Sequence, residues 1–97
     1  MDIFDEIKSN NNFIIFKYSP YCPISQFQEF AFDEWIKHQA VKYTKINVIT
    51  QRDISNAIAN IFNIKHESPQ IIFFIDGTPV YHASHNNINL NKIESML

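Results

Sequence analysis

The sequence predicts an α/β fold in which helices flank a central four-stranded mixed sheet. Short apolar runs alternate along the chain with segments whose apolar residues recur at helical spacing, as in strand–helix–strand units. Near the end of the chain, Asp76-Gly77 separates two strand-like runs, which is a strong signal for a hairpin of antiparallel strands. A length of 97 residues suits one domain, so we expect a single domain over residues 1–97.

The first half of the chain predicts a short amphipathic helix within residues 1–12, a strand at 13–18, a helix at 23–39 and a strand at 41–48. We expect one apolar stripe of the long helix to face the sheet and its charged side chains to face solvent. The expected stripe comprises Ile24, Phe27, Ala31 and Trp35, flanked by Phe30, Phe32 and Ile36, and the opposite face comprises Gln26, Glu29, Asp33 and Lys37.

The second half predicts a helix, a hairpin and a last helix. Thr50 is expected to cap a helix that ends at Asn63. Five large apolar residues at 71–75 predict a central strand, residues 78–83 predict the returning strand, and Asn89 is expected to cap the last helix. The order is therefore αβαβαββα, which is the thioredoxin arrangement with an extra N-terminal helix. Its strand–helix–strand unit implies a right-handed parallel crossover.

Composition narrows the classes of function. A single glycine argues against phosphate-cradling loops, and a net charge of −2 without a basic cluster speaks against nucleic acid as the main partner. No apolar run approaches membrane-spanning length and no signal peptide is recognisable, so we expect no membrane partner. One cysteine cannot form an internal disulfide, and the reducing cytoplasm is therefore the expected location.

Cys22 is placed where a nucleophile forms easily. It follows the strand at 13–18 and precedes Pro23, and proline is favoured at the first helical position. Free N–H groups and the helix dipole at such a site stabilise the thiolate, which is the reactive form of cysteine. A free cysteine is often only a small buried apolar residue, but this position favours a reactive one.

Ser25 stands where a C-x-x-C dithiol would have its second cysteine. A hydroxyl cannot close a disulfide, so a mixed disulfide on Cys22 would need a thiol from another molecule. Ser25 is expected either to donate a hydrogen bond to the Cys22 thiolate or to satisfy N–H groups of the first helical turn. In the thioredoxin arrangement Pro69 faces the cysteine loop, and we expect a cis bond that presents the Ser68 backbone to a disulfide partner.

The histidines and the tyrosines near the cysteine loop are weaker indications of a functional site. No cysteine or carboxylate cluster accompanies the histidines at metal-ligand spacing, so no metal site is expected. Tyr18 and Tyr21 flank the cysteine loop and either shape a groove for a small thiol or simply pack. The histidines are His38, His66, His82 and His85.

Three motifs occur in order along nearly the whole chain: Cys-Pro-Ile-Ser at 22–25, His-Glu-Ser-Pro-Gln at 66–70 and His-Ala-Ser-His at 82–85. Together they resemble the monothiol bacilliredoxins, which are thioredoxin-fold proteins of the bacillithiol redox system. Two positions depart from that pattern, since Tyr21 stands where threonine is expected and Asn86 where tryptophan is expected.

The resemblance implies a monothiol oxidoreductase that exchanges disulfides with S-bacillithiolated proteins. Cys22 would take the bacillithiol, a second bacillithiol would restore Cys22, and a flavoprotein reductase would recycle the bacillithiol disulfide. Bacillithiol is then a co-substrate, and no tightly bound cofactor is expected. The implied catalytic residues are Cys22, Pro23 and Ser25, and the implied substrate-binding residues are Tyr21, Ile24, Ser68 and Pro69.

Two other classes stay open. One is an iron–sulfur cluster carrier of the monothiol glutaredoxin type, although those proteins have Gly-Phe where this chain has Pro23-Ile24. The other is a non-catalytic thioredoxin-like binding module, which predicts an unreactive Cys22. The residues alone also leave bacillithiol, glutathione and coenzyme A open as the small thiol, and only the resemblance selects bacillithiol.

Overall fold

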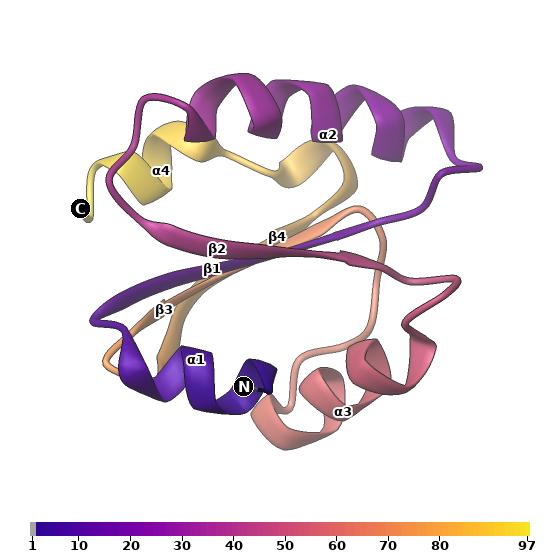
Figure 1. The fold of residues 1–97 in the computed structure, drawn as a ribbon. Helices are drawn as coiled ribbons and strands as arrows, with labels where there is room; N and C mark the ends of the chain where they lie inside the picture. Colours follow the sequence, from indigo (N-terminus) through magenta and orange to yellow (C-terminus); the bar gives the residue numbers. More distant parts are fainter. Residues whose placement is uncertain (1) are drawn as a thin grey trace.

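The computed structural model describes residues 2–97, and its elements follow the expected order. They are α1 (Ile3–Ser9), β1 (Asn12–Tyr18), α2 (Pro23–Ile36), β2 (Lys42–Asn47), α3 (Arg52–Phe62), β3 (Gln70–Ile75), β4 (Thr78–Ser84), the 3₁₀ helix η1 (His85–Asn87) and α4 (Leu90–Glu94). The strands form one sheet in the order β2-β1-β3-β4, in which β1 and β2 are parallel and the other pairs antiparallel. α2 and α4 cover one face of the sheet, and α1 and α3 cover the other (Figure 1). The predicted mixed sheet between helices is confirmed.

The central strands β1 and β3 are buried on both faces. Their side chains alternate between two apolar clusters, one beneath α1 and α3 and one beneath α2 and α4. The first cluster includes Phe13, Ile15, Ile72 and Phe74, and the second includes Ile14, Phe16, Ile71 and Phe73. Because helices cover both faces, these strands read in the sequence as continuous apolar runs rather than alternating ones.

The orientation of α2 differs from the expected one. Phe27 and Phe30 are 71% and 69% exposed, and Ile24 is also exposed. The buried residues of the helix are Phe32 and Ile36, which were expected beside the stripe, and Ser25. The helix also ends at Ile36, three residues before the expected boundary. The apolar stripe expected to face the sheet was therefore wrong at its N-terminal half.

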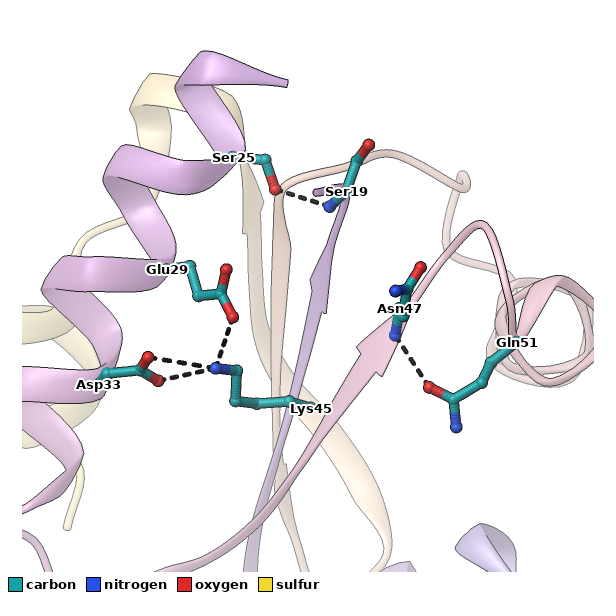
Figure 2. Close-up of polar contacts among 7 residues, drawn as sticks. All are labelled: Ser19, Ser25, Glu29, Asp33, Lys45, Asn47 and Gln51. Carbon is teal, nitrogen blue, oxygen red and sulfur yellow. Dashed lines mark hydrogen bonds and ion pairs between the residues drawn. The ribbon is translucent and has the colours of Figure 1, made fainter. Parts of the chain in front are cut away.

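Contacts with the sheet explain this orientation. The Lys45 ammonium of β2 forms ion pairs with Glu29 and Asp33, two side chains expected in solvent (Figure 2). On the same side of the helix, the Phe32 ring stacks on that of Phe16 with their centroids 4.6 Å apart. Both contacts require the face that contains Glu29 and Phe32 to lie against the sheet, so Ile24, Phe27 and Phe30 are left exposed.

Most of the predicted turns and caps are confirmed. Asp76 and Gly77 adopt φ values of 51° and 82°, the left-handed pair that a tight hairpin turn requires. Asn63 ends α3 in the left-handed conformation, and the Asn89 side chain caps α4. The expected cap at Thr50 was wrong, because α3 begins at Arg52 and its N-cap is Gln51.

Asn47 and Gln51 build the turn before α3 instead. The Asn47 side chain accepts the Thr50 N–H at 3.3 Å, and the Asn47 N–H donates to the Gln51 side chain at 2.9 Å (Figure 2). Thr50 thus lies inside a turn that two amide side chains already hold. Within the part of the chain that the structure describes, no helix is both long and apolar enough to cross a bilayer.

Candidate active site

Cys22 is the N-cap residue of α2, directly before Pro23 at the first helical position. Its carbonyl accepts the first helical hydrogen bond from the Gln26 N–H at 2.9 Å. Its thiol is free and partly exposed, and it makes no capping hydrogen bond. The first turn of α2, all of which the structure describes, contains no acidic side chain. The positive end of the helix dipole, which favours negative charge, is therefore not opposed by an acidic side chain in that turn.

The helix that follows Cys22 also holds the loop that precedes it. The fully buried Ser25 hydroxyl accepts the Ser19 N–H at 2.8 Å (Figure 2). The Gln26 side chain donates to the Pro20 carbonyl at 2.7 Å. The first turn of α2 thus fixes the path of the chain between β1 and the cysteine.

Ser25 makes a contact that differs from the two that were expected. Among the described residues no hydrogen bond joins Ser25 to Cys22, and the N–H that Ser25 accepts belongs to the loop rather than to the helix. Its hydroxyl oxygen positions the cysteine loop. Sequence spacing cannot reveal this role, because it depends on how closely the end of β1 approaches the buried face of α2.

The strand register brings the predicted Ser68–Pro69 segment to the edge of the sheet at which the cysteine loop begins. Lys17, near the end of β1, pairs with Gln70 at the start of β3, and Gln70 pairs with Ser84 at the end of β4. The Ser68–Pro69 bond directly precedes Gln70 and is cis, so the expected isomer is confirmed. The cysteine loop, which follows β1, and the cis-proline loop, which precedes β3, therefore lie at the same edge of the sheet, as Figure 1 shows.

A chain of polar contacts ties the cis-proline loop to β4. The Gln70 side chain donates to the Ser84 hydroxyl at 3.3 Å, and that hydroxyl donates to the Glu67 carboxylate at 3.3 Å. The other Glu67 oxygen lies 3.5 Å from His85 Nδ1. The His85 N–H donates to the Pro69 carbonyl at 2.9 Å. These contacts join the residues on both sides of the proline to the end of β4 and to η1.

Lys17 is a buried cation at this edge that the sequence analysis missed. Its side chain is fully buried, its ammonium donates to the Ser55 carbonyl at 3.0 Å, and it lies 3.4 Å from His66 Nδ1. Burial lowers the pKa of Lys17 from 10.5 to about 8. Burial, together with the positive charges of Lys17 and Arg52, also lowers the pKa of His66. The available signal was a lysine inside a strand that apolar residues mark as buried on both faces.

The remaining candidates lie elsewhere or stay exposed. Tyr21 is 80% exposed beside the cysteine, whereas Tyr18 is partly buried against the core with the Lys45 ammonium over its ring. His38 and His82 are exposed. Among residues 2–97, no group of three or more histidine, cysteine or acidic side chains is arranged to hold a metal ion.

The sheet order, with a lone cysteine at the N-terminus of α2, places this chain among the thioredoxin-like thiol oxidoreductases. The chain has one cysteine, as expected for a monothiol member of that class. The chain belongs to the monothiol bacilliredoxin family, because the family model described as "Monothiol bacilliredoxin BrxC" matches residues 1–93.

Solved structures agree with this fold. A proposed oxidoreductase with a thioredoxin fold is 31% identical over 94% of this chain and 81% of its own, with a TM-score of 0.86. A thioredoxin variant from Halobacterium salinarum is 18% identical over 97% of this chain and 78% of its own, with a TM-score of 0.72. Thioredoxin f2 from Chlamydomonas reinhardtii is 11% identical over 97% of this chain and 84% of its own, with a TM-score of 0.71. The two thioredoxins show the fold alone.

Proposed function

We propose that this protein removes bacillithiol from S-bacillithiolated proteins in a bacterial cytoplasm. The Cys22 thiolate attacks the bacillithiol sulfur of the mixed disulfide, and the bond between that sulfur and the substrate sulfur breaks. A new disulfide then joins Cys22 to bacillithiol. The substrate cysteine leaves as a thiolate and takes a proton from solvent.

A second bacillithiol completes the cycle. Its thiolate attacks the bacillithiol sulfur bound to Cys22, releases the Cys22 thiolate and forms bacillithiol disulfide. A flavoprotein reductase then supplies the two electrons that return this disulfide to two bacillithiol molecules. Both exchange steps need only thiols, so the proposal gives no role to a metal or a prosthetic group.

The observation that carries this proposal is the placement of the only cysteine in the chain. Cys22 is partly exposed at the N-terminus of α2, where the helix dipole favours a thiolate. Because Ser25 stands where a resolving thiol would be, an external thiol must release the group bound to Cys22. Membership of the bacilliredoxin family supports bacillithiol as that thiol.

Two neighbours of Cys22 would act by positioning it. Pro23 begins the helix without requiring a partner for a backbone N–H, and this keeps the cysteine at the helix terminus. Ser25 holds the loop before the cysteine through its contact with Ser19. Neither residue needs to touch the substrate for these roles.

The substrate would contact the surface on both sides of the thiol. Tyr21 and Ile24 are exposed next to Cys22 and offer apolar contact to the mixed disulfide. The Ser68–Pro69 segment lies at the same edge of the sheet, and the Ser68 backbone would pair with the chain of the protein substrate. Such backbone pairing would orient the disulfide without selecting a particular substrate sequence.

The test uses one folded protein prepared in two forms, with its cysteine modified by either bacillithiol or glutathione. Release of the substrate thiol is followed by intact-protein mass spectrometry, with Cys22→Ser as the control enzyme. We expect rapid release from the bacillithiolated form, slower release from the glutathionylated form, and none with the serine variant. Release from the glutathionylated form alone would contradict the choice of thiol. No release from either form, with iron and sulfide present in anaerobically purified protein, would favour a cluster carrier.

A further inference from the structure

An apolar strip runs along the outer side of α2, starting beside the cysteine. It comprises Ile24, Phe27 and Phe30, whose side chains are 42%, 71% and 69% exposed. Residues three apart are neighbours on a helix surface, so the three side chains follow one another away from Cys22. Two phenylalanines this exposed on one helix form an apolar surface that the fold itself does not use.

The sheet-facing contacts of α2 prevent the strip from turning inward. Ser25 is hydrogen-bonded to the loop after β1, and Lys45 forms ion pairs with both Glu29 and Asp33 (Figure 2). Rotation that buried Phe27 would break the ion pairs and expose the side of the helix that packs on the sheet. Figure 1 shows α2 and α4 together on one face of the sheet, and η1 is in contact with α2. The strip is therefore a fixed outer surface.

The length of the strip indicates a macromolecular occupant. At 1.5 Å per helical residue, Phe30 lies about 12 Å from Cys22 along the axis, farther than a small thiol needs to extend. A protein whose cysteine is disulfide-bonded at Cys22 would have surface at that distance. Self-association is a weaker explanation, since three side chains offer much less than the ~800 Å² per partner of a standard stable interface.

Charge near the strip also limits the chemistry of the partner. The charged residues on the outer side of the next helical turn, Glu34 and Lys37, form an ion pair with each other at 2.9 Å. The strip thus ends at an ion pair rather than at an unpaired charge. An uncharged, apolar partner segment matches it best.

From these contacts we propose that Phe27 and Phe30 dock an apolar segment of the thiol-modified protein substrate, next to its modified cysteine. The inference deepens the function proposed above and rests on it. It makes the strip a determinant of substrate choice, because proteins with a charged surface around the modified cysteine would bind less well.

The experiment compares a protein substrate with a small one. The double variant Phe27→Gln/Phe30→Gln removes the aromatic rings, and glutamine is a good helix former. The matched control, Ile54→Gln/Ile61→Gln, removes two exposed apolar side chains from α3, on the other face of the sheet. The substrates are a bacillithiolated protein and the mixed disulfide of bacillithiol with free cysteine, and both are repeated with glutathione in place of bacillithiol.

We expect the phenylalanine double variant to lose about tenfold in kcat/KM toward the protein, with little change toward the small disulfide. The isoleucine control should match the wild type on both. Equal loss on both substrates, or no loss on the protein, would overturn the docking role. So would a wild-type dimer in sedimentation that the phenylalanine variant abolishes.

The glutathione arm separates the two proposals. If the wild type acts only on the glutathione pair, bacillithiol is the wrong thiol, and the ratio of protein to small-disulfide activity still decides the docking role. A wild type inactive on all four disulfides would overturn both proposals.

Discussion

The buried Lys17 should make the stability of the protein rise between neutral and alkaline pH. Burial lowers its pKa in the folded state from 10.5 to about 8. Below about pH 8 the lysine is protonated in both states, and the folded protein bears the full cost of a buried ammonium. Between about pH 8 and 10.5 the unfolded chain binds more protons than the folded one, so the free energy of unfolding increases with pH. Above this window both states are neutral and the cost is absent.

The pKa difference sets the size of this effect. It corresponds to at most about 3 kcal/mol at 1.36 kcal/mol per pH unit. We therefore expect a gain of about 1–3 kcal/mol across the window. Lys17→Met keeps the length of the side chain and removes the titrating group. The gain should therefore be present in the wild type and absent in this variant.

The assay is urea unfolding followed by circular dichroism at several pH values from about 7.5 to 10. Other titrating groups are common to both proteins and cancel in the difference between them. Lys37→Met is the matched control, because the hydrogen bond and charge of Glu34 raise the pKa of Lys37. The free energy of unfolding of Lys37→Met should therefore depend on pH in the same way as that of the wild type. Parallel curves for the wild type and Lys17→Met would refute the reasoning.

Three further predictions concern the site and its support. Cys22→Ser should abolish disulfide exchange with the fold intact by circular dichroism, and retained exchange would remove Cys22 as the nucleophile. Ser25→Cys should allow an internal disulfide with Cys22 under mild oxidation, detectable as a loss of two mass units, and its absence would contradict the loop geometry. Lys45→Met should cost about 1–2 kcal/mol at neutral pH, because Glu29 and Asp33 then face each other without a cation. That cost should shrink at high salt, which screens the charges of this partly exposed cluster, and a cost independent of salt would exclude the ion pairs as its cause.

The sequence contained the signals for the strands and for the cysteine because those signals are local. A continuous apolar run marks a strand covered on both faces, and Asp76-Gly77 supplies the backbone conformation that a tight hairpin needs. Pro23 marks the start of a helix by its own chemistry, and so places Cys22 at the terminus. None of these features depends on a distant partner.

The face of α2 that meets the sheet could not be read in the same way. Apolar residues occur around most of this helix, so periodicity alone offers two faces of similar character. The choice is made by Lys45, which lies on another strand and pairs with Glu29 and Asp33. A pattern within one helix cannot contain that information.

The polar contacts beneath the cis-proline loop were missed for a related reason. Lys17, Gln70 and Ser84 come from three different strands, and only the register places them side by side. Their partners Ser55 and Glu67 lie outside those strands. Long-range pairings of this kind become visible only once the sheet is assembled.

The most direct test of the proposed mechanism is detection of its intermediate. A bacillithiolated protein is mixed with one equivalent of this protein without free bacillithiol, the thiols are blocked with acid and alkylating agent, and tryptic peptides are analysed by mass spectrometry. We predict that bacillithiol appears as a disulfide on the peptide that contains Cys22, in an amount equal to the substrate thiol released. Released substrate thiol with an unmodified Cys22 peptide, or no release at all, would contradict nucleophilic attack by this cysteine.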